Sequence, residues 1–239
     1  MTNFNQISHF SHPNHTLKLE YSEIPFKCDG CKEVGIGSHY TCATCDFDLH
    51  MHCANYSPTI FHPYYPKWTF QFLPSLPGNT PRYCNGCEKE VIGFVYHCYK
   101  CGYNLHSCCA KLLMSLHDRE VNLYLYKKVS SPCYKCGRKG RSWSYRSKCN
   151  KYNLHVACEM EMLMENWQDR YVGQGERRIL LETRIPSLKN TLCTRHHKSK
   201  AGKVLEFCKI AGLVVQTIIS ALLGDPSALI VGITEALMS

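Results

Sequence analysis

A pattern of cysteine and histidine residues repeats along the first two-thirds of the chain with a period of about fifty residues. In the first copy a Cys-x2-Cys pair is followed ten residues later by a second pair, and four residues after that by His-x2-Cys. The second copy keeps every spacing, and the third keeps the first pair and His-x2-Cys at the same separation. A fixed period of this length is typical of tandem small modules. The copies comprise Cys28, Cys31, Cys42, Cys45, His50 and Cys53; then Cys84, Cys87, Cys98, Cys101, His106 and Cys109; and finally Cys133, Cys136, His155 and Cys158.

The chain contains 17 cysteines and 13 histidines in 239 residues, which suits either a disulfide framework or a set of metal sites. The first residues, MTNFNQISHF, contain no basic segment followed by an apolar run, so we expect no secretory signal there and a cytoplasmic or nuclear location. In a reducing compartment, Cys-x2-Cys pairs with a histidine at a fixed distance favour zinc over disulfides. Three Cys3His zinc sites would lower the formal charge from +9 to about +6, so the protein stays basic.

The order of these residues resembles that of the plant divergent C1-domain proteins, which are relatives of the phorbol-ester/diacylglycerol finger. The resemblance covers residues 9 to about 160 and includes a leading histidine, His15, twelve residues before Cys28. It implies small zinc-stabilised α+β finger modules with short strands, zinc knuckles and a short helix. It also implies two interleaved zinc ions in each complete module, in closed sites that serve structure.

The resemblance assigns ligands module by module, for about four to five zinc ions per chain. In the second site of the second module, Trp68 stands at the leading position, so this site recruits a water or another histidine, or stays partly filled. In the third module Ser147 and Asn150 replace the second pair, which leaves one site. The implied sets are Cys28, Cys31, His50 and Cys53; His15, Cys42, Cys45 and His62; Cys84, Cys87, His106 and Cys109; Cys98, Cys101 and His117; and Cys133, Cys136, His155 and Cys158.

Other histidines near the knuckles do not match ligand positions, and we expect them to face solvent or to surround the sites without binding metal. They are His9, His12, His39, His52 and His97. The remaining cysteines are expected to be buried and inert, namely Cys108, Cys149, Cys193 and Cys208.

The sequence divides into five segments. The first module is expected at residues 9–62, the second at 63–117 and the third at 118–165, followed by a basic connector at 166–202 and an apolar helical hairpin at 203–239. Gly224 ends the first arm of that hairpin, and Asp225-Pro226 begins the second. The hairpin suits packing against the fingers, an oligomerisation surface or membrane insertion, and we favour the first two because apolar helices usually bury in protein.

The third module is strongly basic and interleaves its charges with aromatic residues, a pattern that suits an anionic partner such as nucleic acid or an anionic lipid as well as a solvated face. Diacylglycerol binding is not expected, because the ten-residue loop between the cysteine pairs is short and carries no apolar tip. The proposed anionic-partner face comprises Lys135, Arg138, Lys139, Arg141, Trp143, Arg146 and Lys148.

Three functions from different classes are considered. The first is a zinc-binding interaction or adaptor protein without enzymatic activity, and the resemblance to divergent C1-domain proteins implies that it acts through protein partners in intracellular signalling or stress responses. The second is a membrane-associated protein that uses the apolar hairpin and the basic face. The third is a thiol–disulfide oxidoreductase that uses the Cys-x2-Cys pairs, and it is disfavoured because every pair belongs to a zinc pattern.

Overall fold

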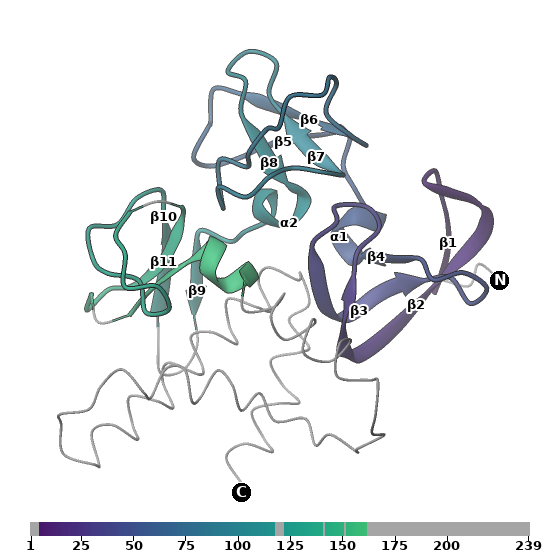
Figure 1. The fold of residues 1–239 in the computed structure, drawn as a ribbon, viewed down its shortest axis with the longest axis horizontal. Coiled ribbons are helices and arrows are strands. Elements are labelled where there is room, and N and C mark those ends of the chain that lie inside the picture. Colours follow the sequence, from purple (N-terminus) through teal and green to yellow (C-terminus); the bar gives the residue numbers. More distant parts are fainter. Residues whose placement is uncertain (1–4, 118–121, 141, 151, 162–239) are drawn as a thin grey trace, which may run out of the picture. The chain divides into compact units, whose positions relative to one another are not determined.

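The computed structural model describes residues 5–117, 122–140, 142–150 and 152–161 (Figure 1). The expected connector at 166–202 and hairpin at 203–239 lie outside the described residues. Within the described ranges no helix is long and apolar enough to cross a membrane. One compact unit contains the chain up to Leu112, and a second unit begins at Leu113.

The first repeat folds into a four-stranded antiparallel sheet in which the strands follow chain order. Strands β2 and β3 pair most extensively, from Lys18 opposite Thr41 to Lys27 opposite Val34. The last strand leads directly into a single helical turn, so the His-x2-Cys motif spans the end of a strand and the start of a helix. The elements are β1 (Gln6–His9), β2 (His12–Lys27), β3 (Val34–Thr41), β4 (Asp48–His50) and α1 (Met51–Ala54).

The second and third repeats have the same strand order and the same antiparallel pairing. Their first strands begin at Thr59 and Ser115, a few residues before the module boundaries expected from the sequence. Residues 156–161 of the third repeat are helical, at the position that α1 and α2 hold in the other two. The elements are β5 (Thr59–Phe61), β6 (Thr69–Leu73), β7 (Val95–His97), β8 (Asn104–His106) and α2 (Ser107–Ala110), then β9 (Ser115–His117), β10 (Asn122–Tyr126), β11 (Ser144–Ser147) and β12 (Asn153–His155).

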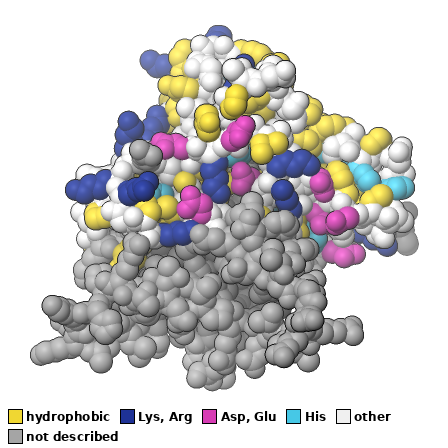
Figure 2. Space-filling view, in the orientation of Figure 1, with side chains coloured by type: hydrophobic (Ala, Val, Ile, Leu, Met, Phe, Trp, Pro, Cys, Tyr) yellow, Lys and Arg dark blue, Asp and Glu magenta, His cyan; other side chains and the backbone are white. Residues whose placement is uncertain are grey.

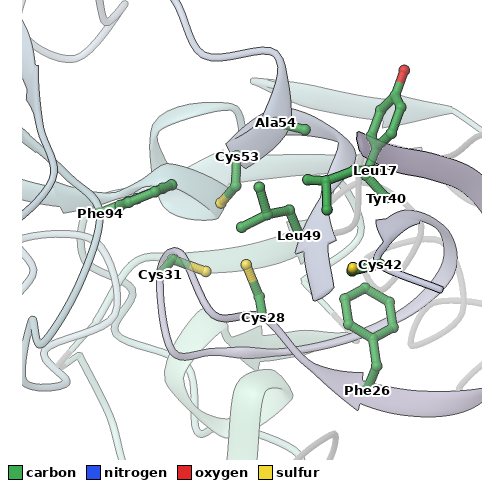
Figure 3. Close-up of a cluster of buried hydrophobic side chains, with 10 residues drawn as sticks. All are labelled: Leu17, Phe26, Cys28, Cys31, Tyr40, Cys42, Leu49, Cys53, Ala54 and Phe94. Atoms are coloured by element: carbon green, nitrogen blue, oxygen red, sulfur yellow. The ribbon is translucent and has the colours of Figure 1, made fainter. Parts of the chain in front are cut away.

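Each repeat encloses a small apolar core with the same pattern. A buried tyrosine on the third strand pairs with a buried leucine on the fourth strand, and an apolar residue of the second strand packs nearby. The three sets are Tyr40, Leu49 and Leu17; Tyr96, Leu105 and Phe70; and Tyr145, Leu154 and Leu123. In the first repeat this core lies against the cysteine sulfurs, as Figure 3 shows. A module of about fifty residues buries little apolar surface, so we expect bound metal to contribute to its stability.

The first Cys-x2-Cys of each repeat lies in a tight knuckle closed by the same backbone hydrogen bonds. In the first repeat the Cys28 N–H donates to the Glu33 carbonyl at 3.0 Å, and the Lys32 N–H donates to the Cys28 carbonyl at 2.9 Å. The residue after the second cysteine is left-handed in all three knuckles, with φ of 64° at Lys32, 61° at Glu88 and 69° at Gly137. Only the third repeat places a glycine at this position.

Substitutions at this left-handed position are expected to change stability with opposite signs. Gly137→Ala should lower the free energy of unfolding of the third module by about 1 kcal/mol, because a Cβ is strained at positive φ. Glu88→Gly should stabilise the second module by a similar amount or less, since glycine adopts this conformation freely. Denaturant unfolding of the zinc-loaded proteins measures both changes, and equal stability of all three proteins would contradict the expectation.

The first and second repeats share a close backbone contact within one compact unit. The Phe94 N–H donates to the Gly30 carbonyl at 2.8 Å, and the Phe94 side chain joins the buried cluster of the first repeat (Figure 3). A Cβ built on Gly93 would clash with the Gly30 carbonyl oxygen. The approach of the two repeats therefore requires glycine at position 93.

Candidate metal centres

The His-x2-Cys motif and the first cysteine pair come together in the first repeat. The donor atoms of Cys28, Cys31, His50 and Cys53 all lie within 4.8 Å of one another, and all four residues are buried. The knuckle holds the first two, the end of β4 holds His50, and α1 holds Cys53. Figure 3 shows the three sulfur atoms pointing toward one another.

The donor separations fit a tetrahedral zinc ion. Bonds of about 2.3 Å to sulfur and about 2.0 Å to nitrogen place a sulfur and a nitrogen ligand about 3.5 Å apart. In the first repeat the Nδ1 atom of His50 lies 3.3 Å from the Sγ atom of Cys31 and 3.9 Å from that of Cys53. A Cys3His set with this spacing can hold one zinc ion and leaves no ligand position open.

The second and third repeats build equivalent sites, as the sequence predicts. The groups are Cys84, Cys87, His106 and Cys109, and Cys133, Cys136, His155 and Cys158. The distance from Nδ1 of His106 to Sγ of Cys87 is 3.2 Å, and Nδ1 of His155 lies 3.4 Å from Sγ of Cys136 and 3.7 Å from Sγ of Cys158. In all three sites the histidine presents Nδ1 to the cluster.

The protein surrounds the first cysteine of each site with groups that favour its thiolate. The backbone N–H of the ligand histidine donates to that sulfur at 3.4 Å in each repeat. Burial opposes ionisation of Cys28, but hydrogen bonds from Cys31 and Cys53 and the nearby His50 hold its pKa well below the ordinary value. A hydrogen bond from Cys158 lowers the pKa of Cys133 to about 3. Because zinc binds the thiolate, this environment prepares each site for metal.

The first repeat contains a second group of four donors, and its composition differs from the expected one. The structure brings together His12, His15, Cys42 and Cys45, so His12 stands where His62 was expected. The Nδ1 atom of His15 lies 3.7 Å from Sγ of Cys42 and 3.2 Å from Sγ of Cys45. This Cys2His2 site is more open to solvent than the three Cys3His sites, because His15 is exposed.

The register of the strands explains why His62 is not part of this group. His62 directly follows β5, which pairs with β6 in the second sheet. It is 1% exposed, and its ring lies 5.5 Å from that of Tyr64 and 5.9 Å from that of Tyr65. The signal for His12 was present in the sequence, since His12-x2-His15 has the same spacing as the cysteine pair that it faces.

The second pair of the second repeat, Cys98 and Cys101, belongs to no group of three or more donors among the described residues. Its knuckle is intact, since the Gly102 N–H donates to the Cys98 carbonyl at 2.8 Å. Strand register places Tyr65 and Trp68 at the positions of His12 and His15, because Ile60 pairs with Phe70 as Ile7 pairs with Leu17. His117 lies in β9 of the third sheet, and its place as a ligand stays a prediction.

The third repeat keeps the backbone of the second knuckle without its ligands. The Ser147 N–H donates to the Tyr152 carbonyl, as the Cys98 N–H donates to the Tyr103 carbonyl. Ser147 and Asn150 therefore occupy the two cysteine positions, as the sequence predicts. Cys149 is not buried as expected: it is exposed, and its Sγ lies 3.2 Å from Oγ of Ser147. Cys108 is buried, and Cys193 and Cys208 lie outside the described residues.

The residues of the proposed anionic-partner face differ in their surroundings. Trp143 is 2% exposed and belongs to the core, so it cannot stack on a partner as expected. Lys135 lies 3.6 Å from Glu161, and the guanidinium of Arg146 lies 4.3 Å above the ring of Tyr126. Arg141 lies outside the described residues, whereas Arg138, Lys139 and Lys148 are exposed.

Chelators are expected to remove zinc from the Cys2His2 site first. His15 and Cys45 are accessible to solvent there, while all three Cys3His sites are largely enclosed. Stopped-flow release to a colorimetric chelator should show one zinc ion in a fast phase and three in slower phases. Cys42→Ser should remove the fast phase alone, and release of every ion in one phase from the wild-type protein would contradict the expectation.

Comparison with known proteins agrees with this geometry. The C1 domain family model matches residues 10–54 and 61–110. A segment of 49 residues is 41% identical to "Probable nucleoredoxin 1" of Arabidopsis thaliana, and it covers 20% of this chain and 8% of that protein. No solved structure matches the chain with significance. Residues 10–54 and 61–110 therefore resemble cysteine- and histidine-rich C1 domains, and both contain Cys/His groups that could hold a metal ion.

Proposed function

We propose that this protein is a zinc-stabilised interaction protein that carries four zinc ions per chain and acts through protein partners. The observation that supports the proposal is the donor count of the four groups, each of which brings four potential ligand atoms together. A hydrolytic zinc ion needs a position open to water or substrate, and a four-donor set provides none. Zinc then stabilises the fold of the modules, and the surfaces of the modules bind the partners.

The partner surface with the best support is the basic edge of the third module. Arg138 and Lys139 follow the first knuckle, and Lys148 lies in the second, so all three charges project from loops. Figure 2 shows Lys and Arg side chains exposed on this part of the molecule. Such a surface suits an acidic protein segment, and long-range attraction would speed its association. Signalling or stress response is the cellular setting that we propose for this binding.

The experiment compares the partners captured by the wild-type protein and by two variants that keep all of the metal ligands. The variant Arg138→Glu/Lys139→Glu/Lys148→Glu reverses the exposed charges, and Lys18→Glu/Lys67→Glu/Lys111→Glu reverses three exposed charges elsewhere. Quantitative crosslinking in cells should show partners that the wild type and the second variant retain and the first variant loses. An identical partner set for all three proteins would refute this surface.

An insulin-reduction assay tests the alternative that the Cys-x2-Cys pairs catalyse thiol–disulfide exchange. Zinc-saturated wild-type protein is expected to show little turnover in this assay, because zinc then binds four of the five Cys-x2-Cys pairs and leaves only Cys98 and Cys101 unassigned. Turnover that persists under zinc saturation would refute a purely structural role for the cysteines.

A further inference from the structure

We propose that Glu33, in the first repeat, is a positioning residue for the zinc site of the second repeat. The inference rests on the proposed zinc sites and extends them, because it makes metal binding in one module depend on the docking of its neighbour. Nothing in the Cys-x2-Cys pattern indicates such a link.

The contact is made by the ligand histidine itself. His106 presents Nδ1 to the cysteine sulfurs, so its Nε2 carries the proton and points away from the metal position. This Nε2–H faces two acceptors, the Glu90 carbonyl at 3.0 Å and Oε1 of Glu33 at 3.4 Å. The first acceptor belongs to the same repeat, and the second comes from the neighbouring repeat. His106 is buried, and the side chain of Glu33 is 12% exposed, so water screens the pair only weakly.

The arrangement is specific to this site. The backbone pairing of the knuckles places Glu33, Lys89 and Arg138 at equivalent positions in the three repeats. Only the first repeat therefore carries an acid there. The Nε2 atoms of His50 and His155 are buried, and neither forms an ion pair with a carboxylate among the described residues. Of the three Cys3His sites in the described chain, His106 alone has a carboxylate beside its outer nitrogen.

Docking of the two repeats brings Glu33 to His106. The Phe94 N–H bonds to the Gly30 carbonyl three residues before Glu33, and Gly93 permits this approach. A second contact joins the hydroxyl of Tyr96 to the backbone N–H and carbonyl of Ser57, at 3.1 Å each. Tyr96 lies on β7, which pairs with the strand that ends at His106. The interface thus fixes the distance between the carboxylate and the imidazole.

A carboxylate that accepts a hydrogen bond from a ligand histidine fixes its tautomer and ring orientation and makes its other nitrogen a better donor. Loss of such a partner typically weakens metal binding by 10–100-fold. Without Glu33, the zinc ion held by His106 should therefore bind about ten times more weakly or worse. The other three sites should keep their affinities.

The test uses the full chain loaded with ¹¹³Cd²⁺ for NMR and with Zn²⁺ for chelator competition. The variant is Glu33→Gln, which keeps the shape and removes the charge, and the control is Glu20→Gln at an exposed position of β2. Glu33→Gln should shift one cadmium resonance from a Cys3His site and lower the affinity of one zinc ion at least tenfold. Glu20→Gln should match the wild type in both readouts.

A second variant separates positioning from stability. Gly93→Ala pushes the repeats apart and should shift the same cadmium resonance, and adding Glu33→Gln to it should produce little further loss of affinity. Four unchanged resonances and affinities in Glu33→Gln, or equal weakening of all four ions, would overturn the proposal. A wild-type protein without metal at Cys84 and His106 would instead refute the zinc assignment itself.

Discussion

Cys133→Ser is expected to unfold the third module and to leave the first two folded. This module holds one metal group, whereas the first repeat holds two, so losing one ligand removes its only described site. Structural zinc contributes on the order of 10 kcal/mol to the folding of such a module, far more than its small core can replace. Native mass spectrometry should show one zinc ion fewer, and amide exchange should show lost protection of β10–β12.

The matched control is Cys149→Ser in the same module. Cys149 is exposed and belongs to no metal group among the described residues, so this variant should keep every zinc ion and all of its amide protection. Retained protection of β10–β12 in Cys133→Ser would mean that the third module folds without metal. That result would contradict the structural role that we assign to zinc.

His12→Ala is expected to remove one zinc ion, and His62→Ala is expected to remove none. His12 supplies one of four donors in the Cys2His2 site, while His62 lies after β5 in the second sheet. The first repeat should stay folded in His12→Ala, because its buried Cys3His site is intact, but the knuckle around Cys42 should lose amide protection. Zinc counts from native mass spectrometry distinguish the two variants.

Both variants remove a histidine, so the comparison controls for side-chain loss. His62 is buried, and its removal should lower the melting temperature without changing the metal content. Loss of a zinc ion from His62→Ala together with full occupancy in His12→Ala would reverse our assignment and restore the one expected from the sequence.

The three Cys3His sites were predictable because each ligand belongs to a short motif with fixed spacing. Two cysteines of a knuckle and a His-x2-Cys at the end of a hairpin come together whenever the strands pair in chain order. The loss of ligands at Ser147 and Asn150 was predictable for the same reason, since the knuckle keeps its backbone hydrogen bonds after its cysteines are gone.

Three donors of the group formed by His12, His15, Cys42 and Cys45 were predicted from the sequence, and His12 lies where His62 was expected. Its histidines, His12 and His15, lie at the start of β2, and only the pairing of β2 with β3 brings them to the second knuckle. His62 looked suitable because its sequence distance from Cys53 resembles that in the related fingers, but strand pairing assigns it to the second sheet. Distance along the chain cannot show which of two neighbouring sheets a residue joins.

The burial of Trp143 and the contact between Glu33 and His106 also depend on tertiary structure. Trp143 lies among basic residues in the sequence, yet its ring is buried in the core of the third repeat with Tyr145 and Leu154. The Glu33 contact joins two repeats through backbone approach at Gly30 and Gly93, and the sequence indicates this only as two glycines among many.

Native mass spectrometry of the intact protein, purified with reductant and without chelator, tests the central claim most directly. The account predicts four zinc ions per chain, one from a Cys2His2 site and three from Cys3His sites. Two or fewer ions, with thiols that still react with an alkylating reagent, would contradict it and would favour redox chemistry at the cysteine pairs.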